Sequence, residues 1–163
     1  MFIKQADIFW GIDHDLVKKI FEQSVKESHD KGDILFNEGD PAKAFYILTK
    51  GWVNITTGGN SQVVHVVSHP GEAFGWSSLV DRDYYSASAI CLKPTLLIRI
   101  DKKHMADSIK NDPVNGLMLY KHLAHSIGNR LINSYQRTAS ETPGKFSESF
   151  GTGQIFLSTE EDM

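Results

Sequence analysis

Short apolar segments separated by glycine-rich turns fill the chain between residues 25 and 100. The segments are rich in β-branched and aromatic residues, and the longest interruption, Pro70–Asp83, is where we look for chemistry. They are Ile34–Phe36, Phe45–Leu48, Trp52–Thr57, Gln62–Val67, Tyr85–Ile90 and Leu96–Ile100. Many short strands without intervening helices are typical of a β-roll or jelly-roll-like barrel, and not of a parallel sheet.

Helical periodicity flanks this β region on both sides. Asp13 can cap a helix whose apolar residues recur at spacings of three and four. After Asp101, Lys102–Asn111 is predicted to form a short helix, and Asp112-Pro113 can start a longer one. The predicted fold class is mainly β with flanking helices, namely a double-stranded β-roll (jelly-roll-like) with an N-terminal helix and a long C-terminal dimerisation helix.

The long helix is expected at Val114–Arg137 and would extend about 36 Å, at 1.5 Å per residue, which is longer than a small roll can cover. Its apolar and small residues alternate spacings of three and four, as in the seam of a two-stranded coiled coil. They are Leu117, Tyr120, Ala124, Ile127, Leu131 and Ser134. We therefore expect a homodimer through this helix, and the alternative is that the helix packs back on its own roll.

The composition of the 163 residues, 40% hydrophobic and 23% charged, is that of one globular domain. We place this domain at residues 1–138, with the roll at 25–100 and the long helix at 113–138, and interpret the polar residues 139–163 as a flexible tail.

The net charge of -3 gives no general attraction to nucleic acid or to an anionic membrane. The single cysteine, Cys91, excludes an internal disulfide, and no apolar stretch is long enough to span a bilayer. A cytoplasmic protein without membrane association is expected.

The segment Lys31–Gly51 contains two strands and three turns, and it carries a family resemblance. Its glycines, the turn residue Asp40 and the aromatic strand Phe45–Ile47 stand where the β-roll of a known family has them, and the agreement continues in register to Ile100. The segment resembles the cyclic-nucleotide-binding domain of the catabolite activator protein type, found in Crp/Fnr-like regulators. The resemblance implies a roll that binds cAMP or cGMP and a long helix that dimerises and closes over the ligand.

In that family a phosphate-binding cassette follows the middle strands, and Pro70–Gly75 resembles its beginning. The resemblance puts the ribose-binding glutamate at Trp76 and the phosphate-binding arginine at Tyr85 or Ser86, so both charged side chains are missing from those positions. Losing the arginine should weaken binding by roughly tenfold or more per lost charge-assisted hydrogen bond. The expected ligand-binding residues are Gly71, Phe74, Gly75, Trp76, Ser77, Arg82, Tyr85, Ser86, Ala87 and Ser134.

Three of these residues have competing interpretations. Arg82, flanked by two aspartates, could turn inward as a phosphate ligand or remain a solvated loop tip. Tyr85 could contact a ligand or fill the buried face of a strand. Ser134, aligned with a hydroxyl that lies near the purine in the resembling family, could also be a tolerated polar residue on a helix.

We expect a non-enzymatic, stand-alone sensor, with cAMP or cGMP as candidate effector, that signals through its long helix to an unknown protein partner. The alternative is a dimeric interaction or scaffold module of the same fold without ligand control. No phosphate loop, dinucleotide fingerprint or nucleophile elbow occurs, and only about twenty-five residues follow the long helix, so direct DNA binding is not expected. The histidine pairs at 65 and 69 and at 122 and 125 lack further metal ligands, and Cys91 or a histidine as haem ligand stays open.

Overall fold

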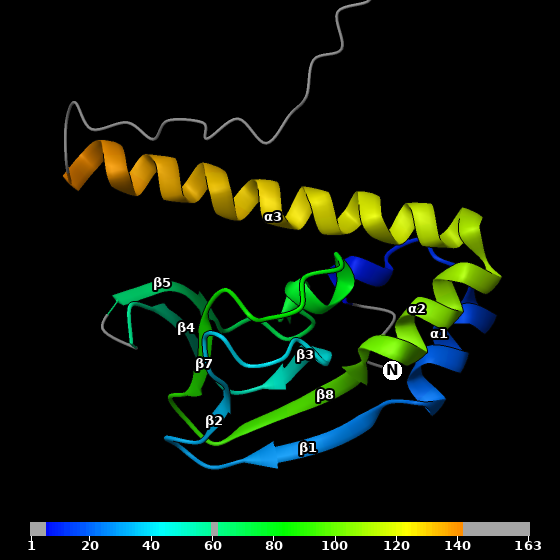
Figure 1. Ribbon diagram of the computed structural model, residues 1–163, viewed down its shortest axis with the longest axis horizontal. Helices are drawn as coiled ribbons and strands as arrows, with labels where there is room; N and C mark the ends of the chain where they lie inside the picture. Colours follow the sequence, from blue (N-terminus) through cyan, green and yellow to red (C-terminus); the bar gives the residue numbers. More distant parts are fainter. Residues whose placement is uncertain (1–5, 60–61, 142–163) are drawn as a thin grey trace, which may run out of the picture.

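The computed structural model describes residues 6–59 and 62–141, and in this part of the chain eight strands form two four-stranded antiparallel sheets (Figure 1). The first sheet has the order β1 (Val25–His29), β8 (Thr95–Asp101), β3 (Ala44–Lys50) and β6 (Ala73–Phe74). The second has the order β2 (Ile34–Phe36), β7 (Ser88–Cys91), β4 (Val53–Thr57) and β5 (Gln62–Val67). The predicted jelly-roll-like class is confirmed.

Strand β3 lies at the centre of the fold because both of its faces are buried. Tyr46 and Leu48 point between the two sheets, into a core that contains the aromatic residues of β2 and β6. Phe45 and Ile47 point to the opposite face, where the helices pack. A strand covered on both faces needs an uninterrupted apolar run, which explains why this segment does not alternate with polar residues.

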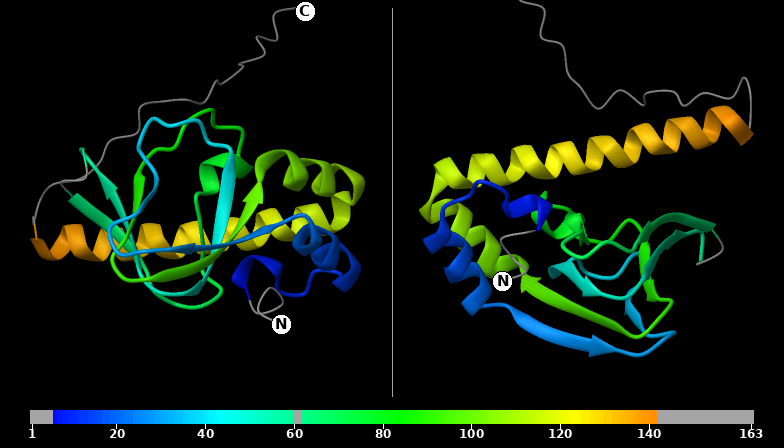
Figure 2. Two further views of the ribbon diagram at one scale, coloured as in Figure 1. Left: turned by 90° about the horizontal axis from the view of Figure 1, so that it is seen from below. Right: turned by 180° about the vertical axis from the view of Figure 1, so that it is seen from behind.

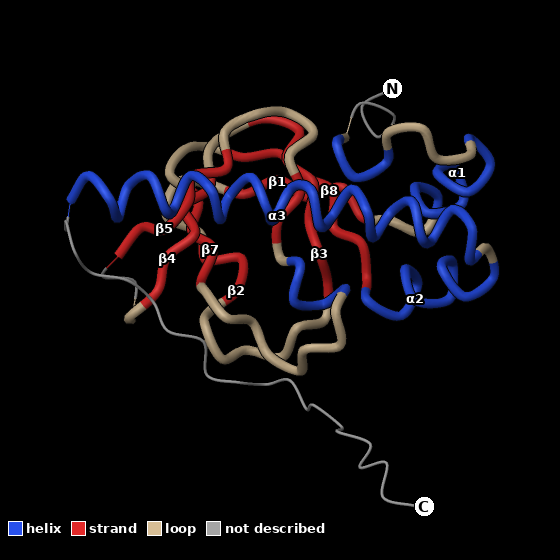
Figure 3. The backbone as a smooth tube through the Cα atoms, turned by 90° about the horizontal axis from the view of Figure 1, so that it is seen from above, coloured by secondary structure: helices blue, strands red, loops and turns tan. Residues whose placement is uncertain are grey.

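The helices cover one end and one side of the roll. They are the short 3₁₀ helix η2 (Asp7–Phe9), α1 (His14–Glu22), α2 (Lys102–Asn111) and the long α3 (Pro113–Glu141). The predicted cap of α1 is confirmed, since the Asp13 side chain accepts a hydrogen bond from the Asp15 N–H at 2.7 Å. Figure 2 shows α1 and α2 together at one end of the roll, and Figure 3 shows α3 running from that end across to β5.

Two predicted boundaries differ from the structure by more than two residues. The strand expected from Tyr85 begins at Ser88, because the backbone of Tyr85 pairs with a turn instead: its N–H donates to the Asp40 carbonyl and its carbonyl accepts from the Gly39 N–H, both at 2.9 Å. Helix α3 continues to Glu141, so the first residues of the predicted tail are helical. The rest of that tail lies outside the described residues.

The inner face of α3 differs from the predicted seam. Leu119 and Leu123 are buried against the roll, and Ile127 packs against the same core. The Tyr120 hydroxyl donates to the Leu79 carbonyl at 3.0 Å. Two residues of the predicted seam, Tyr120 and Ile127, thus contact the roll, and the seam itself stays a prediction. The helix carries apolar residues on two sides, so their spacing alone could not say which side faces the roll.

The outer face of α3 remains uncovered in the described chain. We define it by the residues that recur at alternating spacings of four and three along the exposed side: Leu117, Lys121, Ala124, Gly128, Leu131 and Tyr135. Leu117 is 72% exposed and Tyr135 is 60% exposed. Ala124 and Gly128 make the middle of this face small, which permits the close approach of a second helix.

Candidate ligand-binding site

The chain makes a tight turn at Gly75, between β6 and the short helix η3 (Trp76–Leu79). Gly75 has a left-handed conformation with φ of 77°. A Cβ atom at this position would lie 3.2 Å from Cδ2 of Tyr46 and 3.3 Å from the carbonyl oxygen of Ala44. Glycine therefore meets both requirements of the turn, the positive φ and the close approach to β3. The turn places Trp76 and Ser77 directly after the edge strand of the first sheet.

A recess with a volume of about 40 Å³ opens beside this turn. Its lining comes from β6, η3, the loop before β7 and α3, with contributions from β2 and β4. The lining residues are Phe36, Ile55, Phe74, Gly75, Trp76, Ser77, Tyr85, Ser86, Ala87 and Arg130. The structure thus brings together most of the residues that the sequence predicted as ligand-binding, whereas Gly71, Arg82 and Ser134 lie outside the lining.

Tyr85 lines the recess with its ring but is anchored in the core. The ring stacks on Phe36 with 3.8 Å between the centroids. The hydroxyl donates to the carbonyl oxygen of Ala44 and accepts from the Ala44 N–H at 3.2 Å. Burial raises the pKa of the Tyr85 hydroxyl, which remains neutral at physiological pH. Tyr85 therefore supplies a neutral, fixed wall of the recess.

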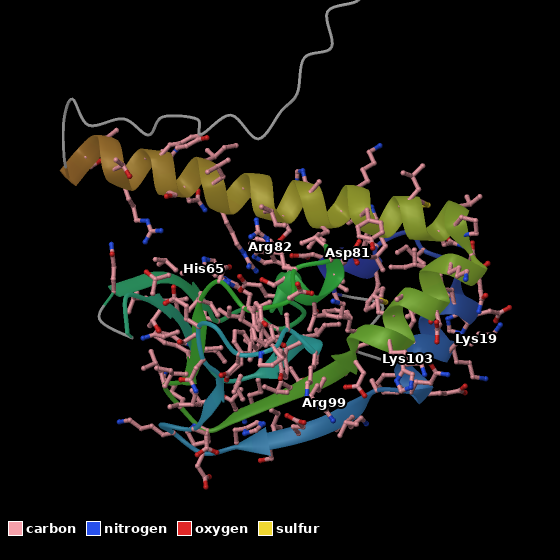
Figure 4. The ribbon with its side chains drawn as sticks, in the orientation of Figure 1. Lys19, His65, Asp81, Arg82, Arg99 and Lys103 are labelled. Carbon is pink, nitrogen blue, oxygen red and sulfur yellow. The ribbon has the colours of Figure 1, made fainter. Side chains whose placement is uncertain are left out.

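Arg82 lies on the exposed loop after η3. Its guanidinium carbon is 5.5 Å from the centroid of the Trp76 ring, a distance typical of a cation–π contact. Figure 4 shows Arg82 and Asp81 on the side of the roll that α3 covers. Arg82 therefore lies over the Trp76 ring, and it is not among the residues that line the recess.

Arg130 of α3 supplies the charge in the recess. Arg130 is the only charged residue among the described residues that line the recess, and its side chain is 20% exposed. Its Nη2 donates to the carbonyl oxygen of Ala73 and lies 3.5 Å from Oε1 of Glu72. The sequence reasoning missed Arg130 as a site residue, although its spacing of seven from Leu123 is typical of residues that share one face of a helix.

Glu72 connects Arg130 to strand β5. Its Oε1 lies 2.6 Å from Nε2 of His65. Burial alone would raise the pKa of Glu72, but the hydrogen bond and charge of His65 and the charge of Arg130 together lower it. Burial lowers the pKa of Arg130 while Glu72 opposes that shift. Both groups are ionised at neutral pH, because an arginine stays protonated even when its pKa is reduced.

A family model described as the cyclic nucleotide-binding domain matches residues 26–112, which are more than half of the chain. The chain belongs to the cyclic nucleotide-binding domain family. The matched residues include both sheets, η3 and α2, and they end just before α3. Arg130 therefore lies outside the part of this cyclic nucleotide-binding domain that the family pattern describes.

Several known proteins are similar to this cyclic nucleotide-binding domain. Human cGMP-dependent protein kinase 2 is 33% identical over 92 residues, covering 55% of this chain and 12% of the kinase. The cyclic AMP receptor protein of Thermus thermophilus is 26% identical over 115 residues, covering 69% of this chain and 53% of the receptor. The structure of a cyclic nucleotide-binding domain from Methylobacillus flagellatus KT shares the fold with a TM-score of 0.75 at 22% identity, over 90% of this chain and 83% of that one. The chain thus spans from an eighth to about half of the length of these two curated relatives.

Gly71 and Ser134 are near the recess of this cyclic nucleotide-binding domain without lining it. Gly71 is buried, and its N–H donates to the Leu48 carbonyl at 2.7 Å, so it fixes the turn before β6. Ser134 is half-buried and lies one helical turn after Arg130, on the same face of α3. A role for Ser134 next to a ligand stays a prediction.

Metal and haem chemistry has no assembled site in the described residues. No group of three or more histidine, cysteine, aspartate or glutamate side chains is placed there to hold a metal ion. The histidines at 65, 69, 122 and 125 border an open groove beside α3 without converging. Cys91 is buried in the core between the sheets.

None of the described helices has the combination of length and hydropathy that a bilayer span requires.

Proposed function

We propose that this domain is a regulatory module that binds a small anionic ligand, with cAMP and cGMP as candidates, in the recess between η3 and β7. One observation carries the proposal: the small or polar residues Gly75, Ser77, Ser86 and Ala87 of the cassette region line one recess together with the guanidinium of Arg130. A cyclic phosphate needs donors and a positive charge, and this recess offers both. No enzymatic step and no direct contact with DNA are part of the proposal.

Signalling would pass through α3, which contributes to the recess with one face and exposes apolar residues on the other. A ligand that prefers one position of α3 shifts the population of helix positions, and this differential affinity is the physical requirement for a switch. The outer face of α3 is the proposed contact of a homodimer, and a protein partner of unknown identity would respond to the helix. A cytoplasmic location belongs to the same proposal, because the single cysteine is free and buried.

Isothermal titration calorimetry with cAMP and cGMP tests this function. We expect one ligand per chain, with a micromolar dissociation constant for at least one of the two nucleotides. Ala87→Leu would fill the recess and should abolish binding, whereas Val63→Leu on the exposed face of β5 should leave binding unchanged. Binding weaker than millimolar for both nucleotides would remove the cyclic-nucleotide proposal.

One observation favours a second function, a dimeric interaction or scaffold module that binds no ligand. Tyr85 is one of the two positions, with Ser86, to which the resemblance assigns the arginine, and it is stacked, hydrogen-bonded and 5% exposed. In this case the protein would dimerise through α3 with the same affinity in the presence and absence of any nucleotide. A crystal structure without added nucleotide that shows an anion bound at Arg130 would speak against the scaffold function.

A further inference from the structure

An anionic ligand in the recess requires a positive partner, and two arginines are near enough to be considered. Arg82 is exposed, lies over the Trp76 ring and does not line the recess. Arg130 lines it, with a side chain that is 20% exposed. A partly buried guanidinium interacts more strongly with an anion than an exposed one, because less water screens the charges. The geometry therefore favours Arg130.

Arg130 also has hydrogen-bonding capacity to spare. A guanidinium carries five N–H donors. In the described part of the chain, the hydrogen bonds of Arg130 go from Nη2 to the Ala73 carbonyl and to Glu72. The donors on Nε and Nη1 make no hydrogen bond to the described residues, so they can meet a phosphate oxygen.

We propose that Arg130 of α3 takes the place of the missing cassette arginine as the anion ligand, and that the ligand competes with Glu72 and Ala73 for this guanidinium. The inference rests on the proposed function and deepens it, because it assigns the charged contact and the step that links the ligand to α3. The positive charge for the phosphate then comes from the moving helix and not from the roll.

The exchange of partners leaves no buried charge without a partner. When Arg130 turns toward a ligand, Glu72 keeps His65, whose Nε2 lies 2.6 Å from Oε1. The carbonyl of Ala73 belongs to β6, which is an edge strand of the first sheet, so water can replace the lost donor. A ligand anion and the pair formed by Glu72 and Ala73 thus hold Arg130 in two alternative positions.

The same helix has a second arginine that provides a matched control. Arg137 donates from Nη2 to the carbonyl of Val64 at 2.6 Å, and it does not line the recess. Arg130→Met and Arg137→Met therefore each remove one tether between α3 and an edge strand. Only the first removes a charge from the recess, so the difference between the two variants isolates the contact with the ligand.

The test is calorimetric titration of the wild type and both variants with cAMP, cGMP and adenosine, which lacks the phosphate. For the nucleotide that the wild type binds, we expect Arg130→Met to weaken affinity about 10- to 100-fold, as for one or two lost charge-assisted hydrogen bonds, and Arg137→Met to weaken it less than about threefold. Arg130→Lys should recover part of the loss. The affinity for adenosine, if measurable, should be the same in all proteins.

Four results would overturn the assignment. If Arg130→Met binds the nucleotide as the wild type does, or loses affinity for adenosine equally, Arg130 is not the anion ligand, although the proposed function survives. If the wild type binds no cyclic nucleotide, both fail together. A readout without substitution is the Nε–Hε NMR signal of Arg130 in the wild type, which must shift on addition of the nucleotide, and an unchanged signal at saturation contradicts the inference even if Arg130→Met does not fold.

Discussion

Gly75 and Tyr85 shape the recess by opposite means. Gly75 has no side chain, and this lets η3 begin in contact with β3. Tyr85 fills the inner wall with a ring that is stacked on Phe36 and hydrogen-bonded to Ala44. Gly75 holds the recess open at its rim, and Tyr85 closes it at its base with a buried, neutral ring.

Gly75→Ala is expected to destabilise the fold more than Gly39→Ala. Both glycines have a positive φ, 77° and 88°, which costs an alanine about 1–2 kcal/mol. Only at Gly75 would the added Cβ press on neighbouring atoms, and overpacking of this kind costs typically about 1–3 kcal/mol more. The free energy of unfolding in urea measures both. If both variants lose the same free energy of unfolding, the close approach of Gly75 to β3 does not add to the cost of the substitution.

The sequence predicts those residues whose role is set by local chemistry. Asp13 caps α1 as expected, and the uninterrupted apolar run of β3 predicts a buried strand. Tyr85 was expected in a strand because its ring favours one, but the backbone there pairs with the turn at Gly39 and Asp40, far away in sequence. Arg130 could not be assigned either, because its contacts depend on how α3 crosses the roll.

At the scale of elements, helix α3 has one face that packs against the roll and one face that is exposed. Its inner face buries Leu119 and Leu123 and brings Arg130 to the recess. Its outer face exposes Leu117, Leu131 and Tyr135 around the small residues in its middle. A helix with a second apolar face that its own roll does not cover can bury that face in a dimer.

Leu131→Glu is expected to convert a dimer into a monomer. Leu131 is 48% exposed on the outer face, and a dimer would place a buried, unpaired carboxylate at its interface. Light scattering coupled to size-exclusion chromatography measures the mass of the particle. Val63→Glu is the control, because Val63 is similarly exposed, at 45%, on β5. A wild type that is monomeric at all concentrations, or a Leu131→Glu variant that stays dimeric, would exclude this interface.

At the scale of the whole molecule, Glu72 joins three segments that are distant in sequence. The carboxylate lies just before β6, accepts from His65 of β5 and pairs with Arg130 of α3. The chain of contacts connects the edges of both sheets to the long helix. Stability and helix position are therefore linked through one ionised carboxylate.

Glu72→Gln is expected to lower stability in a pH-dependent manner. The pKa of Glu72 in the folded state lies below its ordinary value of 4.5, so folding favours the ionised form. This contribution is complete above pH 4.5 and is lost as the pH falls through the lower, folded-state pKa. The free energies of unfolding of wild type and variant should therefore differ at pH 7 and converge as the pH falls below 4.5.

Glu22→Gln is the control for this comparison. It removes one partner of an exposed pair with Lys18 at 4.0 Å, and such pairs contribute about 0.5 kcal/mol or less. If the free energies of unfolding of wild type and Glu72→Gln differ by the same amount from pH 7 to pH 3, the ionised Glu72 carboxylate does not contribute to stability as proposed.

The two arginine tethers of α3 also bear on how the protein avoids aggregation. Arg130 donates to a carbonyl of β6 and Arg137 to a carbonyl of β5, and these are edge strands of the two different sheets. An uncovered edge strand presents unpaired backbone groups to which a strand of another chain can add. The long helix thus covers one edge of each sheet, at β6 and at β5, and a truncation that removes it should yield a roll that associates through these strands.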